Sequence, residues 1–327
     1  MLNDTLQRVA EKYAKTQSTV VNHFIKSLEF MKRIPWITST HGLFNQFEEV
    51  TNVEGGSFKD LDAPFDAMSA DTELKRISMK VMGGEMSVAE DAALAMDNST
   101  ADSAAAAARY FAKQTPSVLN KSGQTVEKHF IYSSLYPAML AYNKKIKSDA
   151  SKRTMFSAGG TGSTNYSIFA IRQAKEQNCG VVSPIGKNKD EIMSMEWLNG
   201  GERHYINHGK DNGKIGYEAT WKAYFQYQLA CPEYLGGIFN IDPANNHMVT
   251  AAMIDDLLDS IEADTSDTIL VMARSMASKL GNLKWEKIQL DNEDANISTK
   301  ILKWNGIPII GTNTMLKGTE EVTTLPW

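Results

Sequence analysis

The spacing of apolar residues first predicts helix in the N-terminal half of the chain. Over residues 3–33 apolar side chains recur at roughly helical intervals, and Pro35 ends this pattern. A second region, residues 87–133, is rich in helix-forming residues, and its alanine-dense run from Ser103 to Lys113 has the highest helix propensity of the chain. We expect Pro116 and Gly123 to interrupt it.

Alternating patterns predict strands in two other places. Residues 73–88 alternate in part, and we expect Gly83 and Gly84 to end or bulge this strand. From residue 155 to 242 the segments "SIFAIRQ" and "GVVSPIG" read as strands, and an aromatic-rich stretch after them predicts an antiparallel meander or sheet. Within it, "WKAYFQYQ" alternates as a half-buried strand does, and it is too poor in Lys and Arg for a nucleic-acid stacking platform.

The last 80 or so residues change to an α/β pattern. "TAAMIDDLLDSIEAD" predicts an amphipathic helix with Thr250 as its N-cap. "TILVMA" predicts a buried strand, and "RSMASKLG" predicts a short helix that ends at Gly281. Asn305-Gly306 between two apolar runs is the strongest hairpin signal in the sequence.

An acidic segment separates the first helix from the first long strand. Between Gly42 and Glu73 there are eight acidic residues and one lysine, Lys59. A stretch so polar and rich in Gly cannot bury a core of its own. Two interpretations stay open: an ordinary solvated loop, or an arm that becomes ordered against a neighbouring subunit, since long loops in compact domains are usually functional.

Composition places the chain among globular proteins. It has 327 residues, 42% of them apolar, and a formal net charge of −5, which gives no sign of a dedicated nucleic-acid binder. The two cysteines, Cys179 and Cys231, form neither a disulfide framework nor a metal motif, and we expect both to be small core residues in a reducing compartment. The first 15 residues lack the apolar core of a signal peptide, and the apolar runs are too short to span a membrane.

The Gly-rich stretch "MFSAGGTGSTNYS", residues 155–167, raises the question of a phosphate-binding loop. It lacks the lysine and hydroxyl that the P-loop spacing requires. "GVVSPIGKN" fails in the same way, with a proline inside and Asn188 at the hydroxyl position. We therefore expect residues 155–167 to form a turn that enters a strand, with glycines supplying positive φ angles.

No other group of residues has the spacing of a catalytic or metal-binding motif. His204 and His208 lie four residues apart but among turn and β-type residues, so we interpret them as a solvated loop pair. Asp255, Asp259 and Glu262 fall on the polar face of a helix, which predicts a solvated face. The sequence therefore predicts no enzyme activity, no cofactor and no metal site.

The order of several segments resembles the major capsid proteins of short-tailed bacteriophages, which have the Hong Kong-type tailed-phage capsid fold. These segments are "ELKRISMKVMGGEMSV", "HFIYS", "SAGGTGSTNYSIFAIR", "GVVSPIG", "YFQYQLA…GGIFNID", "IDDLLDSIEA", "TILVMARSMASKL" and "WNGIPIIGTNTM". The resemblance extends from about residue 30 to the end. It implies an α+β fold with a peripheral domain of long spine helix and β-sheet, an axial domain of a sheet flanked by helices, and an extended β-loop.

The resemblance also implies a division of the chain. It gives an N-terminal helical arm at 1–39, the extended loop at 40–72, a peripheral domain at 73–150 with the spine helix at about 97–127, and an axial domain with returning peripheral strands at 151–327. This last region includes a β-rich insert at about 155–242, whose placement in either domain stays open. The subunit-interface residues that we predict on this basis are Glu48, Glu49, Glu54, Lys59, Asp60, Asp62, Asp255 and Asp259.

The implied function is a coat protein that self-assembles, through pentamers and hexamers, into the icosahedral head of a virion. Its expected partners are further copies of itself, scaffolding and cement or decoration proteins, the portal, and packaged double-stranded DNA contacted non-specifically, with no membrane. Assembly is expected in the host cytoplasm. The alternatives are a soluble α/β enzyme with an unrecognised active site, a compartment shell protein of the same fold, and a tail or decoration protein.

Overall fold

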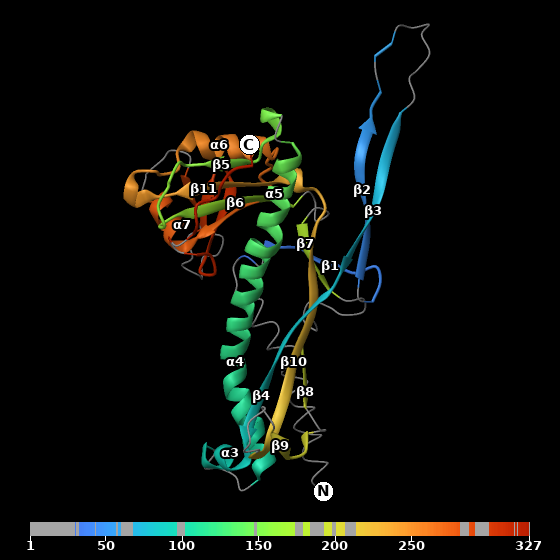
Figure 1. Ribbon diagram of the computed structural model, residues 1–327, viewed down its shortest axis with the longest axis vertical. Coiled ribbons are helices and arrows are strands. Elements are labelled where there is room, and N and C mark those ends of the chain that lie inside the picture. Colours follow the sequence, from blue (N-terminus) through green and yellow to red (C-terminus); the bar gives the residue numbers. More distant parts are fainter. Residues whose placement is uncertain are drawn as a thin grey trace.

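The computed structural model consists of two β-sheets joined by one long helix, with a two-stranded arm projecting from the body (Figure 1). It describes residues 30, 33–42, 44–56, 58–59, 68–96, 102–146, 149–173, 179–183, 193–197, 201–206, 214–281, 288–291, 301–316, 318 and 320–326. The predicted N-terminal helix at 3–33 lies almost wholly outside the described residues; of these residues Phe30 and Arg33 are helical, and Pro35 follows.

The first sheet has six strands, in the order β1-β7-β10-β4, with β8 and β9 also pairing with β10. Its strands are β1 (Trp36–Thr38), β4 (Lys80–Ala89), β7 (Cys179–Ser183), β8 (Met193–Trp197), β9 (His204–Ile206) and β10 (Lys214–Leu229). The strand β4 follows one edge of β10, while β9, β8 and β7 pair with successive parts of it. All pairs with β10 are antiparallel, so the predicted antiparallel sheet is confirmed, but the strands form no meander, since β7, β8 and β9 each pair with β10. The strand β1 pairs parallel with β7.

The side chains of β10 alternate between the core and the partly exposed face. Trp221, Ala223 and Tyr227 are buried, and Lys222 and Tyr224 are partly exposed, so the prediction of a half-buried strand is confirmed. The Tyr227 hydroxyl donates a hydrogen bond to the main-chain oxygen of Val126 in the long helix, at 2.9 Å. This bond ties the central strand of the sheet to the helix that covers it.

The expectation that Gly83 and Gly84 would end or bulge their strand is wrong. Strand β4 runs through both glycines, and its register with β10 is continuous. A Cβ atom on Gly83 would lie 2.3 Å from the main-chain oxygen of Trp221, whereas one on Gly84 would meet nothing within 4 Å. Gly83 therefore allows the backbones of β4 and β10 to lie close together. Besides bulges, such a close approach is a common reason for a glycine inside a strand.

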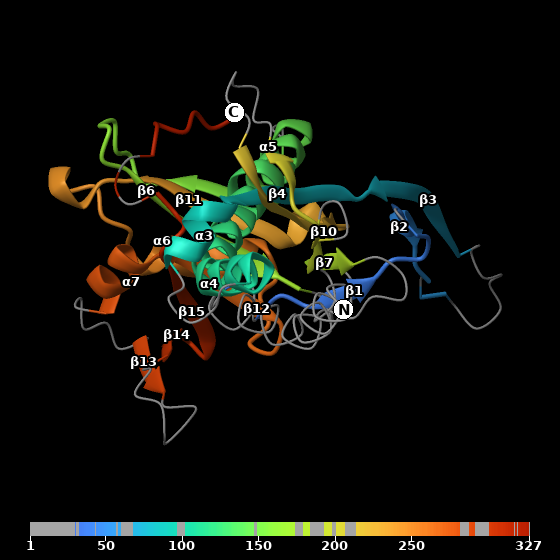
Figure 2. The same ribbon diagram turned by 90° about the horizontal axis from the view of Figure 1, so that it is seen from below.

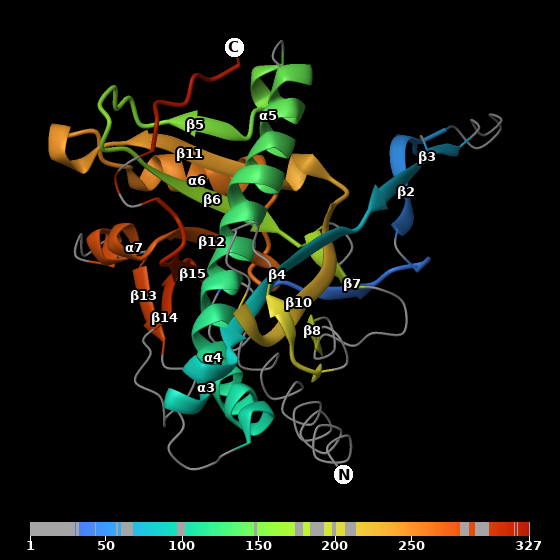
Figure 3. The ribbon, with the colours of Figure 1, turned by 60° about the horizontal axis from the view of Figure 1, so that its bottom comes forward.

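The long helix consists of α4 (Ser103–Phe130), a π-helical turn η1 (Ile131–Leu135) and α5 (Tyr136–Lys145). Asp102 caps it, since its side chain accepts a hydrogen bond from the main-chain N–H of Ala104 at 3.0 Å. A short helix, α3 (Glu90–Met96), lies beside the start of α4 (Figures 1 and 3). The predicted spine helix is therefore present, but it begins at Ser103 and continues well beyond residue 127.

The predicted interruptions of this helix do not occur. α4 continues through Pro116 and Gly123. Gly123 is buried and lies on the packed side of the helix. The helix buries one face along most of its length, including Ala107, Phe111 and Val126, and this packing outweighs the local cost of a proline and a glycine.

The second sheet has seven strands, in the order β13-β14-β15-β12-β6-β11-β5. Its strands are β5 (Met155–Ser157), β6 (Tyr166–Arg172), β11 (Leu235–Ile241), β12 (Thr268–Ala273), β13 (Ile288–Asp291), β14 (Ile301–Trp304) and β15 (Ile307–Thr312). The strands β11 and β12 are buried along their whole length, so the prediction for "TILVMA" is confirmed. The turn between β14 and β15 has Asn305 at φ +47° and Gly306 at φ +86°, as a type I′ hairpin requires.

Residues 155–242 do not form an insert of their own. The strands β5, β6 and β11 belong to the seven-stranded sheet, and β7 to β10 belong to the six-stranded sheet. The chain therefore crosses between the two sheets within this segment and supplies the central strand of the smaller one. Composition did not reveal this division because both sheets use the same β-branched and aromatic residues.

Two helices, α6 (Ala251–Ser260) and α7 (Arg274–Gly281), pack on the seven-stranded sheet (Figure 3). The Thr250 hydroxyl accepts a hydrogen bond from the main-chain N–H of Met253, so the predicted N-cap is confirmed. Ile254, Leu257 and Leu258 form the buried face of α6. No helix among the described residues is both long and apolar enough to cross a membrane.

The Gly-rich stretch forms the turn between β5 and β6, as predicted. Only Gly159 has a positive φ angle among its glycines, at +88°. Gly160 is required for another reason, since a Cβ atom there would lie 2.6 Å from the main-chain oxygen of Asn240. The buried Asp242 carboxylate organises the turn by accepting hydrogen bonds from Thr164 at 3.0 Å and from the Asn245 side chain at 2.6 Å.

The two adjacent glycines of β4 provide a matched pair of variants. We expect Gly83→Ala to lower the free energy of unfolding by about 1–3 kcal/mol, because the new methyl group meets the backbone of β10. Gly84→Ala should leave stability unchanged or raise it by about 0.4–1 kcal/mol, since it restricts only the unfolded chain. Urea unfolding of the two variants tests this expectation, and equal losses of stability would contradict it.

The Asp242 carboxylate should make stability depend on pH. The hydrogen bond from Asn245, supported by those from Thr164 and Ala244, holds the pKa of this carboxyl below its ordinary value, against the effect of burial. A depressed pKa in the folded state adds stability that is complete above the unfolded pKa, about 3.9, and is lost as pH falls through the folded pKa.

We therefore expect Asp242→Asn to lower the thermal unfolding midpoint at pH 7. The difference from the wild type should shrink as pH falls below about 4, where the Asp242 carboxyl of the unfolded wild-type chain begins to bind a proton that the folded state still excludes. Asp256→Asn, which removes an exposed carboxylate from α6, serves as the control. A difference between wild type and Asp242→Asn that is the same at pH 3 and pH 7 would rule out this role.

Candidate assembly surfaces

The most prominent external feature is a two-stranded arm formed by β2 (Phe44–Glu54) and β3 (Ser69–Ser78). The strands pair antiparallel from Phe44 opposite Ser78 to Glu54 opposite Ser69, with an irregularity between Val50 and Asn52. Figures 1 and 2 show the arm projecting from the body on the side away from α6 and α7. Its residues correspond to the predicted extended loop at 40–72, continued to Ser78.

The arm does not bury a core against its own chain. Nine of the ten residues of β3 are exposed, and the tenth is partly exposed. An isolated two-stranded ribbon is at best marginally stable in water, and both of its outer edges offer unpaired N–H and C=O groups. The arm is therefore the part of the described chain with most to gain from contact with another molecule.

The base of the arm is fixed to the body by buried polar contacts. The Asn45 side chain donates a hydrogen bond to the side-chain oxygen of Gln228 in β10 at 2.8 Å and accepts one from the main-chain N–H of Thr40 at 3.1 Å. Both Asn45 and Gln228 are buried. Since β3 is followed after Met79 by β4, which pairs with β10, the arm is held at two points of the six-stranded sheet.

The base of the arm carries basic residues, which lie just beyond the acidic window of the sequence. Lys75 pairs with Glu49, and the Arg76 guanidinium lies over the Phe44 ring at 3.8 Å from its centre. Glu49 also lies directly opposite Glu73 in the register, and like charges in that position are unfavourable. Lys75 offsets this repulsion, so the base of the arm is electrically balanced while its distal part is acidic.

The structure places the predicted interface residues in three settings. Glu48, Glu54 and Lys59 are exposed on the arm, and Glu49 is partly buried through its pairing with Lys75. Asp60 and Asp62 lie outside the described residues. Asp255 and Asp259 lie on α6, far from the arm (Figure 1), so these eight residues form no single surface.

The prediction of a solvated face on α6 is wrong for Asp255. Its carboxylate accepts a hydrogen bond from the indole N–H of the fully buried Trp304 at 3.1 Å. Asp259 and Glu262 are exposed as predicted. Asp255 therefore has a structural role, joining α6 to the β14–β15 hairpin, and Asp259 alone of this pair is available for contact with another subunit.

The prediction of a solvated histidine pair is also wrong for His204. This residue lies in β9, and its Nε2 atom is 3.1 Å from a carboxylate oxygen of Glu218 in β10. A contact with the main-chain oxygen of Glu202 and the bond to Glu218 raise the pKa of His204. His208 lies outside the described residues. The described residues hold no group of three or more His, Cys, Asp or Glu side chains placed to bind a metal ion.

The cysteine prediction holds for one of the two residues. Cys179 is fully buried in β7, and burial raises the pKa of its thiol to about 12. Cys231 is only partly buried. Neither residue therefore points to nucleophilic chemistry, which requires a stabilised thiolate.

Sequence reasoning missed the exposed apolar residues of the arm. Phe58 is fully exposed, Met68 is 72% exposed and Leu74 is 62% exposed. Large apolar side chains gathered on one thin element, rather than scattered singly, are typical of interaction surfaces. The available signal was the presence of Phe58, Met68 and Leu74 in a segment otherwise too polar to form a core.

Comparisons with known proteins give matches among solved structures only. No family model matches the sequence, and no curated protein matches it. A chain from the near-atomic-resolution structure of bacteriophage Epsilon15 is 15% identical, with 88% of each chain covered and a TM-score of 0.52. A chain of the bacteriophage JBD30 capsid is 10% identical, covers 88% of this chain and 91% of its own, and has a TM-score of 0.46.

The likeness to the Epsilon15 chain extends over most of both molecules and identifies the fold. The chain shares the fold of that bacteriophage Epsilon15 chain, and the α+β fold class predicted from the sequence is confirmed. The virus-like particle from Pyrococcus furiosus is also similar, at 10% identity over 69% of this chain and 98% of its own, with a TM-score of 0.35. The attribution to a short-tailed phage stays a prediction.

The exposed apolar residues of the arm give a test of its role. We expect the double variant Phe58→Ser and Leu74→Ser to fold normally but to form far fewer high-molecular-weight particles, because the arm loses apolar area that association would bury. Tyr205→Ser is the control, since Tyr205 is 70% exposed but lies in β9, outside the arm. Sedimentation profiles measure the outcome, and wild-type amounts of particles from the double variant would contradict it.

Proposed function

We propose that this chain is the major capsid protein of a tailed bacteriophage and that many copies assemble into an icosahedral head enclosing double-stranded DNA. The observation that carries the proposal is the fold: a likeness over 88% of this chain to a chain of bacteriophage Epsilon15, with a TM-score of 0.52. The role is structural, with no catalytic step assigned to any residue.

In this proposal the parts of the chain have separate tasks. Residues 1–39 form an N-terminal arm, 40–72 the main part of the extended loop, 73–150 the peripheral domain with its spine helix, and 151–327 the axial domain with the returning peripheral strands. The extended loop lies over a neighbouring copy, and the α6 side of the seven-stranded sheet faces the symmetry axes of pentamers and hexamers. The exposed residues Glu48, Glu54, Lys59 and Asp259 then contribute to contacts between copies.

The arm supports this assignment by its physical character. The arm has two unpaired strand edges and exposed apolar side chains, whereas the body packs its apolar side chains in a core of its own. A contact built from a thin ribbon is modest in area, and many modest contacts per subunit allow wrongly placed subunits to dissociate. This property suits a closed shell better than a small, permanent oligomer.

Contact with DNA is proposed to be weak and non-specific. The subunit has a formal net charge of −5, and affinity for the DNA backbone depends mainly on Lys and Arg. Scaffolding proteins, cement or decoration proteins and the portal are the further proposed partners, with assembly in the host cytoplasm and final location in the virion. A shell around a cellular compartment uses the same fold and differs in the cargo enclosed.

Expression of the chain alone, followed by sedimentation and electron microscopy, tests the proposal. Closed shells, tubes, or rings of five or six subunits are the expected particles, if necessary after co-expression with a scaffolding protein from the same genome. Purified shells treated with nuclease distinguish a phage head from a compartment shell by their contents. A stable monomer or dimer under all of these conditions would overturn the proposal.

A shortened arm gives a more specific prediction. Gln46 and Arg76 are partners in the register of the hairpin, so residues 47–75 can be replaced by Asn-Gly, the preferred two-residue hairpin turn. This variant keeps the contact between Asn45 and Gln228. We expect a folded, soluble subunit that forms no shells, because the contact across neighbouring copies is lost.

Circular dichroism and thermal unfolding establish whether the shortened variant is folded. A control variant with Glu73→Ala keeps the hairpin length and removes one exposed charge that is not among the proposed contact residues, and it should still assemble. Shells of normal size from the shortened variant would show that the arm is dispensable.

A further inference from the structure

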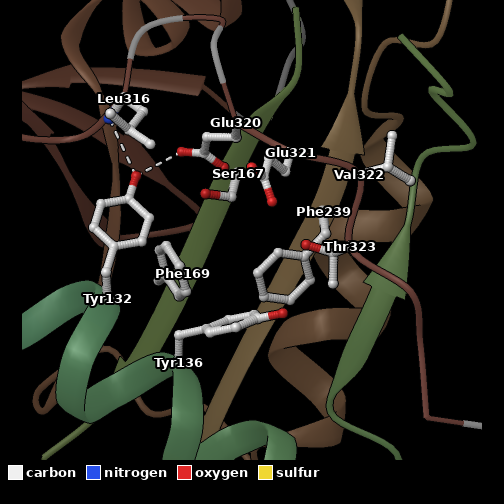
Figure 4. A pocket seen from close by; sticks show the side chains of 10 residues that line it. All are labelled: Tyr132, Tyr136, Ser167, Phe169, Phe239, Leu316, Glu320, Glu321, Val322 and Thr323. Atoms are coloured by element: carbon white, nitrogen blue, oxygen red, sulfur yellow. Dashed lines mark hydrogen bonds between the residues drawn. The ribbon is translucent and has the colours of Figure 1, made fainter. Parts of the chain in front are cut away.

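The C-terminal strap, which comprises the described residues 313–316, 318 and 320–326, crosses the seven-stranded sheet and forms one wall of a half-open cavity of about 420 Å³. Figure 4 shows this cavity between the strap, the strands β6 and β11, and the long helix at η1 and the start of α5. A cavity at the low end of the usual 300–1,000 Å³ range has room for one short organic group.

Hydrogen bonds hold the strap in place over the cavity. The Tyr132 hydroxyl in η1 donates to a carboxylate oxygen of Glu320 at 2.6 Å and accepts from the main-chain N–H of Leu316 at 3.1 Å. The Asn240 side chain bonds both main-chain groups of Thr323, at 2.7 and 2.8 Å. The cavity therefore has a fixed wall on the strap side and is preformed.

The floor of the cavity is aromatic. Tyr136 and Phe169 each contact Phe239 edge to face, with ring centres 5.6 Å apart, and Tyr132 contacts Phe169 in the same way at 6.4 Å. All four rings line the space. Aromatic faces attract cations through the ring quadrupole and give little affinity to anions.

The polar groups of the cavity accept hydrogen bonds. The Glu320 carboxylate lies within it and Glu321 at its exposed rim, and within the described part of the chain neither forms an ion pair. Ser167 is 1% exposed, and its hydroxyl oxygen makes no hydrogen bond of ordinary geometry to the described residues, although it is near Glu320. A buried hydroxyl of this kind has capacity for a ligand donor.

The charge of Glu320 needs compensation. Burial raises the pKa of its carboxyl, and the neutral Ser167 and Tyr132 hydroxyls oppose that rise only in part. A cation that enters the cavity would favour the ionised carboxylate by proximity. A small metal ion would find too few oxygen ligands among aromatic walls, whereas an organic cation uses both kinds of wall.

We propose that the cavity beneath the C-terminal strap binds an organic cation with N–H donors, a guanidinium or a primary ammonium on a short apolar stem. The stem packs on the rings of Tyr136, Phe169 and Phe239. The N–H groups donate to Glu320 and Ser167, and Glu321 attracts the charge at the rim. The source of the cation is either a free small amine or a Lys or Arg side chain of a neighbouring copy.

Calorimetric titration of the purified full-length chain with butylguanidinium tests the proposal, and butylurea is the matched neutral probe of the same shape. We expect saturable binding of butylguanidinium and at least about tenfold weaker binding of butylurea, a difference of about 1.4 kcal/mol. Glu320→Gln should weaken butylguanidinium binding about tenfold. Glu85→Gln, which removes an exposed carboxylate of β4 outside the cavity, should bind as the wild type does.

Glu320→Gln could also weaken binding by loosening the strap, since Glu320 accepts a hydrogen bond from Tyr132. A second variant tests the cavity without changing that bond. Val322 lines the cavity and is 47% exposed, and its apolar side chain takes no part in the hydrogen bonds of the strap. Val322→Trp should therefore fill the space, keep those hydrogen bonds and abolish binding. Absence of saturable butylguanidinium binding to the wild type would overturn the proposal. Equal binding of the two probes, or unchanged binding by both variants, would do the same.

The source of the cation is distinguished by comparing free subunits with assembled particles, an arm of the experiment that rests on the proposed function. A site filled by a neighbouring copy will bind butylguanidinium in the free subunit and not in the particle. A site for a free amine will bind it in both. If no particles form, the proposed function fails while the titration of the free chain still decides the cation site.

Discussion

The fold depends on the burial of two different sheets against a single helix. α4 covers the six-stranded sheet, and α5 lies against the seven-stranded sheet, so the relative position of the sheets is set by the turn between these helices (Figure 3). That turn is the π-helical segment η1, whose residues Ile131 and Leu135 are fully buried. A π-helical turn changes the angular positions of the residues that follow it, so the face buried after η1 differs from the face buried before it. The bond from Tyr227 to Val126 and the edge-to-face contact of Tyr136 with Phe239 fix the two halves.

Much of this arrangement could be predicted from local patterns. The C-terminal helix with its Thr250 cap, the buried strand at 268–273, and the Asn305-Gly306 hairpin follow from capping, uniform burial and turn chemistry. These features have short-range causes, so a window of about ten residues contains the information. The α+β fold class came from the order of such segments along the whole chain.

The predictions that failed depended on distant residues. Gly83 was predicted to end its strand, but in the structure it allows the backbone of Trp221 to lie close beside it. Pro116 was predicted to interrupt the helix, but the packing of both halves of α4 keeps the helix continuous. Asp255 was predicted to be solvated because its hydrogen-bond partner, Trp304, lies far along the chain. For the arm, the acidic composition was visible, but the cations that balance its base, Lys75 and Arg76, lie just beyond the acidic window. The cavity beneath the strap had no local signal, since its walls come from four separate segments.

The position of β10 in the smaller sheet has a consequence for the synthesis of the protein. The strand β4 ends at Ala89, and its only neighbour in the described part of the sheet begins at Lys214. On the ribosome, where chains elongate at about 5–20 residues per second, β4 therefore emerges several seconds before any partner exists. The long helix between them can form from local contacts in that interval. Nascent chains on neighbouring ribosomes thus present unpaired β4 strands to one another during that interval, and slow elongation prolongs the time in which strands of different chains can pair wrongly.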